Sequence, residues 1–97
     1  MHYILDGSSI FSRESLHRAL SETLHFPEWY GANLDALYDC LTCISDPTEL
    51  EIRGCAKLTR ALGDYMERLR QVIDRCAAEN PSFSVVWDDA PDYGKDS

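Results

Sequence analysis

The chain has 97 residues, 44% of them hydrophobic, which is enough for one packed domain and too few for two. Its nine Lys and Arg against 17 Asp and Glu give a net charge of −8, which disfavours nucleic acid and anionic membranes as partners. No apolar run approaches the roughly 18 residues of a membrane span, and residues 1–6 lack the pattern of a secretion signal. We therefore expect a soluble, cytoplasmic protein that is monomeric when free.

Most of the negative charge lies in one stretch of the sequence. Between Ala19 and Ile52 there is no Lys or Arg, whereas there are seven acids: Glu22, Glu28, Asp35, Asp39, Asp46, Glu49 and Glu51. A regional excess of one sign predicts electrostatic attraction of a basic partner.

A strand and a helix are predicted at the start of the chain. Residues 3–5 are apolar or aromatic and precede an Asp-Gly turn, which is typical of a short strand. Ser12 is a favourable N-cap for a helix, and Phe11 before it is expected to pack onto Leu16. This helix is expected to stop before Pro27, because proline disfavours helical geometry in the preceding residue.

A second helix is predicted after a connecting loop over residues 28–31. Asn33 is a favourable N-cap, and the helix is expected to run to about Cys43. Its buried face is predicted by three leucines at helical spacing: Leu34, Leu37 and Leu41.

The second half of the chain alternates strands and helices. An alternating pattern predicts a strand over 50–53, and residues 57–62 are expected to form one or two helical turns. A longer helix follows, in which Asp64 with Glu67 three residues later has the form of a capping box. Residues 83–87 are rich in β-branched and aromatic side chains and predict a strand.

The order of these elements indicates the fold class. Strands that are separated by helices favour a parallel sheet with right-handed crossovers. We predict an α/β domain over residues 1–88, with a small three-stranded parallel sheet covered by three to four helices. Residues 89–97 are polar and are expected to form a flexible acidic tail.

One face of the second helix has a pattern that indicates function. On a helical wheel Asp35, Asp39 and Thr42 share a face, and Tyr38 lies at the edge of the apolar face. Asp is a poor residue for a helix interior, and the two carboxylates repel each other at i, i+4 with no cation nearby in the sequence. Residues that are locally unfavourable for a helix and are grouped on one face predict a functional site. Together with Trp29 from the loop, this face is typical of a surface that binds a basic protein.

Residues 27–42 closely resemble the signature of the barstar family of ribonuclease inhibitors. The run is Pro27-Glu28-Trp29-Tyr30-Gly31-Ala32-Asn33-Leu34-Asp35-Ala36-Leu37-Tyr38-Asp39-Cys40-Leu41-Thr42. The resemblance implies a barstar-like fold, no enzymatic activity, no cofactor, and a one-to-one complex with a basic ribonuclease that is secreted or acts as a toxin. It also implies that the nuclease-binding residues are Trp29, Gly31, Asn33, Asp35, Tyr38, Asp39 and Thr42.

The same resemblance assigns roles and shows departures. It implies that Asp39 takes the place of a substrate phosphate in the nuclease active site and that Trp29 lies against the catalytic histidine. Tyr38 replaces the tryptophan of the family's best-known member, and Cys43-Ile44 replaces its Gly-Trp after the threonine. Arg75 lies near the position of a glutamate on that member's last helix. These departures imply either a target other than the ribonuclease of that member or a smaller contact surface.

Other functions remain open at this point. Cys40 and Cys43 form a CxxC pair, which in other proteins serves thiol redox chemistry or zinc binding. The pair lies at a helix end, where the dipole does not favour a thiolate, so structural thiols are expected. His17 and His25 are the candidate general bases of an enzyme, but both are expected to be exposed and no nucleophile lies at a telling spacing. An acidic interaction module with a partner other than a nuclease is the remaining alternative.

Overall fold

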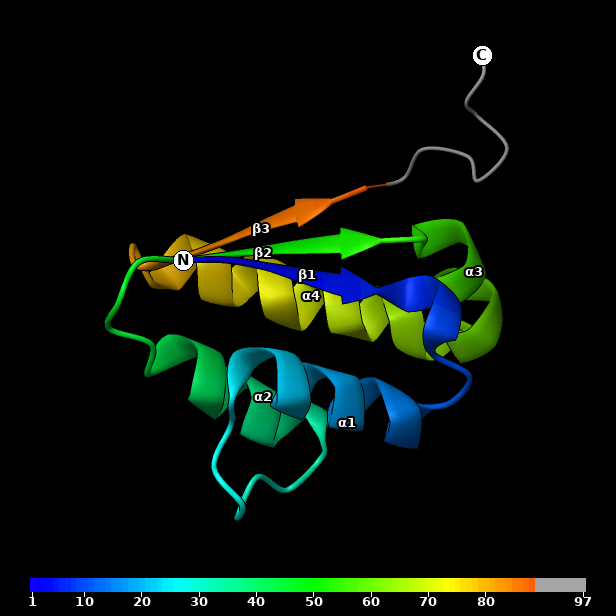
Figure 1. Cartoon of the computed structure of the whole chain (residues 1–97), viewed down its shortest axis with the longest axis horizontal. Coiled ribbons are helices and arrows are strands. Elements are labelled where there is room, and N and C mark those ends of the chain that lie inside the picture. The colour runs from blue at the N-terminus through cyan, green and yellow to red at the C-terminus, as the bar shows by residue number, and fades with distance from the viewer. Residues whose placement is uncertain (89–97) are drawn as a thin grey trace.

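The computed structural model describes residues 1–88, in which a parallel sheet has its helices on one face (Figure 1). In chain order the elements are β1 (His2–Asp6), the 3-10 turn η1 (Gly7–Ser9), α1 (Arg13–Leu24), α2 (Leu34–Thr42), β2 (Thr48–Arg53), α3 (Cys55–Leu62), α4 (Asp64–Glu79) and β3 (Phe83–Trp87). The predicted fold class is confirmed. The predicted tail, residues 89–97, lies outside the described residues. Within the described part, no helix is long and apolar enough to cross a bilayer.

The three strands lie in the order β1-β2-β3, and both neighbouring pairs are parallel. The register places Leu5 beside Ile52, and both side chains are buried beneath the helices. Ile4 and Val86, which are 46% and 43% exposed, lie on the opposite, open face of the sheet. Successive strand residues point to opposite faces, so the alternating pattern of the sequence separates into one covered and one open face.

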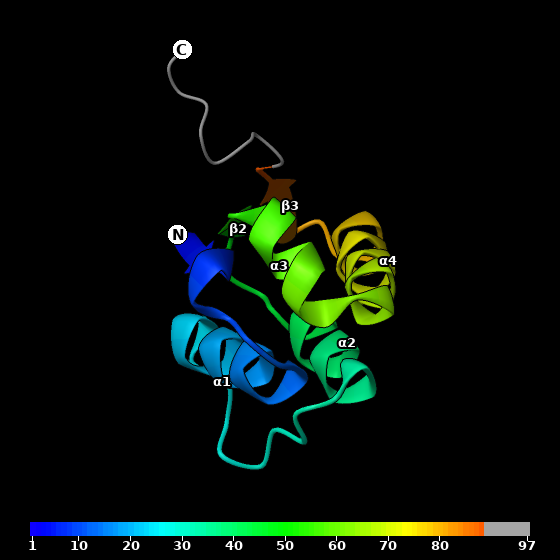
Figure 2. The ribbon, with the colours of Figure 1, turned by 90° about the vertical axis from the view of Figure 1, so that its right-hand side faces the viewer.

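The helices form the second half of the core. α1 packs against β1, α4 packs against β3, and α2 lies against α4 (Figures 1 and 2). Each buried leucine contributes about 1.5–3 kcal/mol relative to an exposed one. Side chains without any exposure come from all four helices and from the central strand: Leu16, Leu20, Leu37, Leu41, Leu50, Ile52, Leu58, Leu69, Ile73 and Cys76.

Two predicted helix-capping details are wrong. Phe11 is 78% exposed and does not staple onto Leu16, because Ile10, at 3% exposure, takes the buried place before α1. Asp64 is the first residue of α4 and not its cap, and no side chain caps that helix. A single residue, Gly63 with a φ of 60°, joins α3 to α4 and leaves no position for a separate capping side chain.

Asn80 ties the end of α2 to the turn between α4 and β3. Its side chain is buried, and its Nδ2 donates to the carbonyl oxygens of Leu41 and Ile44, both at 2.9 Å. Its Oδ1 accepts a hydrogen bond from the backbone N–H of Ser82 at 2.9 Å. One buried amide therefore forms hydrogen bonds with three backbone groups from two segments.

We expect Asn80→Ala to lower the free energy of unfolding by about 2–3 kcal/mol, because the Ile44 carbonyl and the Ser82 N–H then lose the hydrogen bonds that the amide provides. Urea denaturation followed by circular dichroism measures this change. Gln71→Ala removes an exposed amide from α4 and is the control, with an expected change below about 0.5 kcal/mol. Equal stabilities of the two variants would contradict this role of Asn80.

Candidate protein-binding site

The exposed side of α2 contains the two carboxylates that the sequence singles out. Leu37 and Leu41 are fully buried, and this orients the helix so that Asp35 and Asp39 are exposed. Tyr38 is half-buried at the margin, as the helical wheel predicts. The two carboxylates therefore lie one helical turn apart on the solvent side.

The start of α2 is determined by Asn33, and the predicted N-cap is confirmed. Its Oδ1 accepts a hydrogen bond from the backbone N–H of Ala36 at 2.8 Å, and its Nδ2 donates to the Gly31 carbonyl at 3.2 Å. A Cβ on residue 31 would lie only 3.2 Å from this Nδ2, so glycine allows the close approach. Ala32 has a φ of 55°, a left-handed conformation that costs about 1–2 kcal/mol in a non-glycine residue. The surrounding contacts therefore hold the loop in one backbone conformation.

The carboxylates of Asp35 and Asp39 have no hydrogen-bond or ion-pair partner among residues 1–88. Glu51 is different, because Arg53 Nε donates to its Oε2 at 2.7 Å. Two unpaired like charges at i, i+4 destabilise a helix slightly and leave their acceptor oxygens free for a cationic partner. This is the property expected of a binding face.

The stretch between Ala19 and Ile52, which has seven acids and no Lys or Arg, is called the acid-only segment below. It is divided between two surfaces of the folded chain. Glu49 and Glu51 belong to the central strand β2, whereas Asp35 and Asp39 belong to α2. The hydrogen bond from Arg53 holds the pKa of Glu51 below its ordinary value. The negative charge beside α2 is therefore smaller than the sequence count of seven acids suggests.

Trp29 lies in the loop before α2 and is 76% exposed. It shares an open apolar depression of about 320 Å³ with Asp39, and the other lining residues are Leu24, His25, Phe26, Pro27, Cys40, Cys43 and Ile44. A large exposed aromatic side chain next to an unpaired carboxylate combines two features that are common in binding hot spots.

Thr42 and Tyr38 make contacts within the chain that the sequence does not reveal. The Thr42 hydroxyl donates to the backbone carbonyl of Tyr38 at 2.8 Å, so it is turned toward its own helix. The Tyr38 hydroxyl donates to the Glu79 carboxylate on α4, and this bond raises the pKa of Tyr38. Arg75 Nε donates to the other oxygen of Glu79 at 3.0 Å. Because Tyr38 and Glu79 are far apart in the sequence, local periodicity gives no signal for this cluster.

The loop is anchored by His17, which is 2% exposed, so the expectation of an exposed His17 is wrong. Its Nδ1 lies 2.6 Å from the Tyr30 hydroxyl, and its Nε2 lies 2.8 Å from the Tyr65 hydroxyl on α4. A neutral imidazole has one N–H and one acceptor nitrogen, so one tyrosine accepts and the other donates. The signal for this burial is the spacing between His17 and the buried Leu20, which lies three residues later on the same helix face.

The four thiols are reduced in the described part of the chain, and the pKa of Cys40 is raised. None of Cys40, Cys43, Cys55 and Cys76 forms a disulfide. Burial, followed by the nearby charges of Cys43 and Asp39, raises the pKa of Cys40, which lowers its thiolate fraction and its reactivity. Among residues 1–88 no three His, Cys, Asp or Glu side chains are grouped as metal ligands.

A family model described as "Barstar (barnase inhibitor)" matches residues 1–88. The chain belongs to the barstar family. A protein of Bacillus subtilis (strain 168) named "Putative ribonuclease inhibitor YrdF" is 39% identical over 85 residues, which cover 86% of this chain and 93% of that relative. The family resemblance that residues 27–42 indicate is thereby confirmed over residues 1–88.

The buried imidazole predicts a pH-dependent stability. Burial lowers the pKa of His17 below 6.5, so near and below this pH the unfolded chain binds more protons than the folded one. The stability gained by keeping His17 neutral is fully present above the unfolded-state pKa of about 6.5. It is lost as the pH falls from there through the lower pKa of the folded state. We expect His17→Gln, whose amide both donates and accepts hydrogen bonds, to lose less thermal stability than the wild type as the pH falls. Thermal melts between about pH 5 and 7.5 measure this difference. The exposed His25→Gln is the control and retains the loss; equal pH slopes for the two variants would contradict the assignment.

Structural thiols predict that the purified protein binds no zinc in native mass spectrometry. Its melting temperature is expected to be the same with and without dithiothreitol, because no disulfide contributes to the fold. A zinc adduct that disappears in a Cys40→Ser variant, or a lower melting temperature under reduction, would contradict this expectation.

Proposed function

We propose that this protein inhibits a basic ribonuclease by covering its active site with the loop over residues 28–33 and the exposed side of α2. The observation that carries the proposal is that Asp35 and Asp39 have no partner within the described residues and that Asp39 shares a depression with the exposed ring of Trp29. Membership of a family described by barnase inhibition and the name of the relative from Bacillus subtilis support the same class of function.

Asp39 is the residue proposed to enter the nuclease active site. A carboxylate replaces a substrate phosphate there because both are anions that guanidinium groups bind through two parallel hydrogen bonds. Trp29 is proposed to pack on the catalytic histidine. The Asn33 side chain already caps α2, so Asn33 is proposed to contribute through its backbone. The remaining contacts of the proposed face come from Gly31, Asp35, Tyr38 and Thr42.

The charge of this face also determines the expected kinetics. Negative charge on the loop and α2 accelerates association with a basic protein, and this effect decreases as the salt concentration rises. Desolvated charge pairs at Asp39 and the aromatic contact then slow dissociation. In the cytoplasm of a bacterium such a one-to-one inhibitor protects the cell against its own secreted ribonuclease or gives immunity to a rival's toxin.

Capture on the immobilised protein tests the proposal and separates these two roles. The source organism's secretome and the toxins of neighbouring strains are passed over the protein, and bound ribonucleases are identified by mass spectrometry. Barnase, the enzyme that the family's description names, is the first purified probe. We expect near-stoichiometric loss of RNA cleavage with at least one of these enzymes. Full activity of every ribonuclease at excess inhibitor would contradict the proposal.

Asp39→Ala is expected to weaken inhibition by about 3 kcal/mol or more, because the cationic groups of the nuclease then stay buried without a partner. The high rank of this aspartate is taken from the family, in which it is an established hot spot. Glu22→Ala is the matched control, since it removes the same charge from the acid-only segment but lies on α1. Titration of RNA cleavage compares the variants. A folded Asp39→Ala that inhibits as well as Glu22→Ala would show that the assigned face is wrong.

A further inference from the structure

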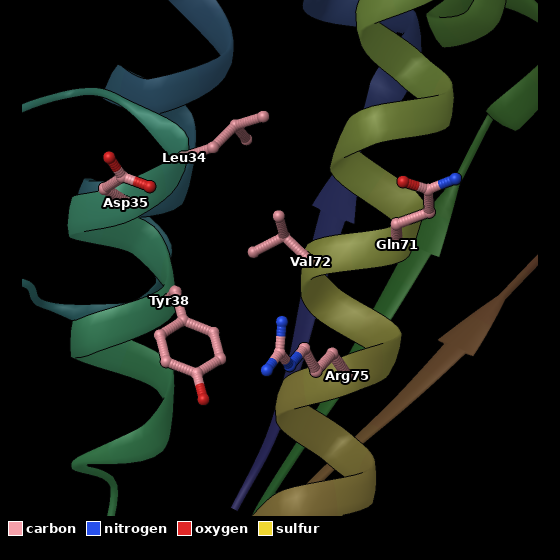
Figure 3. A pocket seen from close by; sticks show the side chains of 6 residues that line it. All are labelled: Leu34, Asp35, Tyr38, Gln71, Val72 and Arg75. Carbon is pink, nitrogen blue, oxygen red and sulfur yellow. The ribbon is translucent and has the colours of Figure 1, made fainter.

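An open cleft of about 320 Å³ lies between α2 and α4, next to the face that contains Asp35. Its lining residues are Leu34, Asp35, Tyr38, Gln71, Val72 and Arg75. Leu34 and Val72 point into the space between the two helices, and Arg75 reaches from α4 toward Tyr38 (Figure 3). The α2 wall of the cleft is therefore acidic, whereas the α4 wall contributes a cation.

Arg75 is oriented by two contacts, and most of its donors remain free. Its Nε donates to Glu79 Oε2 at 3.0 Å, and its Cζ lies 5.5 Å from the centre of the Tyr38 ring. The Glu79 carboxylate also accepts the Tyr38 hydroxyl, so one group orients both side chains. The Arg75 side chain is 69% exposed, and within the described residues its terminal amino groups have no hydrogen-bond partner. A guanidinium has five N–H donors, of which this arrangement uses one.

We infer that Arg75 binds an acidic side chain of the ribonuclease, next to the basic site that Asp35 and Asp39 cover. This inference rests on the proposed function and specifies its partner. Two parallel N–H donors on the free edge of the guanidinium match the two oxygens of a carboxylate. α4 thus extends the inhibitory surface beyond α2, and the complete surface has both signs of charge.

The consequence of this arrangement is selectivity. A ribonuclease with Asp or Glu opposite Arg75 is bound, whereas one with Lys or Arg there brings like charges together and is rejected. A second copy of this chain is a poorer occupant of the cleft, because two molecules with a net charge of −8 repel each other.

Charge reversal of Arg75 tests the inference on the ribonuclease that the wild-type protein captures and inhibits. Arg60→Glu is the matched control, because it makes the same charge change at an exposed position on α3. We expect Arg75→Glu to raise the dissociation constant about ten- to a hundredfold more than Arg60→Glu in surface plasmon resonance. Arg75→Lys is expected to be intermediate, since an ammonium retains the charge but not the two-point geometry. Circular dichroism confirms that each variant is folded, and Arg75→Ala replaces Arg75→Glu if the latter does not fold.

Equal or tighter binding by Arg75→Glu relative to Arg60→Glu would overturn the inference. A wild-type dimer in light scattering that Arg75→Glu dissociates would also overturn it, because Arg75 would then belong to a self-interface. The failure of the proposed function has a different signature, namely a wild-type protein that inhibits no ribonuclease. Inhibition that is lost with Asp39→Ala and unchanged with Arg75→Glu rejects the inference alone.

Discussion

The burial of Leu37 and Leu41 fixes the rotation of α2, and the candidate binding face follows from it. Both side chains have no exposed surface. With 3.6 residues per helical turn, Asp35 and Asp39 are then turned to solvent. Two buried leucines contribute several kcal/mol, whereas repulsion between carboxylates at i, i+4 costs about 0.2–0.5 kcal/mol. The packing term is much larger, so the helix tolerates two unpaired carboxylates on its exposed side.

A buried hydrogen-bond chain holds the loop that precedes this helix. His17 connects Tyr30 in the loop to Tyr65 on α4, and both distances are below 3 Å. Trp29 is the neighbour of Tyr30, so anchoring the tyrosine restricts the positions that the exposed tryptophan can adopt. A loop that is ordered before binding loses less conformational entropy in the complex. Hydrophobic packing orients the carboxylates of the face, and a polar contact in the core anchors the loop that contains Trp29.

The sequence predicts those features that neighbouring residues determine. Asn33 caps α2 as expected, and leucine spacing and β-branched runs predict the elements of the sheet and helices. Two capping details are exceptions, since Ile10 rather than Phe11 is buried and Gly63 joins α3 directly to α4. The other failures occur where a distant residue decides. His17 is buried because Tyr65, 48 residues later, completes its hydrogen bonds, and Tyr38 is held by Glu79, 41 residues later. The helical wheel thus predicts correctly that Asp35 and Asp39 are exposed and that Tyr38 lies at the margin, whereas the contacts of that margin become visible only in the folded chain.

One surface, consisting of the loop before α2, the exposed side of α2 and the adjoining edge of α4, is expected to hold the ribonuclease. Titration of the isotope-labelled protein with the unlabelled ribonuclease that it inhibits, followed by amide NMR signals, tests this most directly. We expect changes over residues 29–42 and at Arg75 that are complete at an equimolar ratio, with β2 and α3 unaffected. Changes centred on the open face of the sheet, around Ile4 and Val86, would contradict this account.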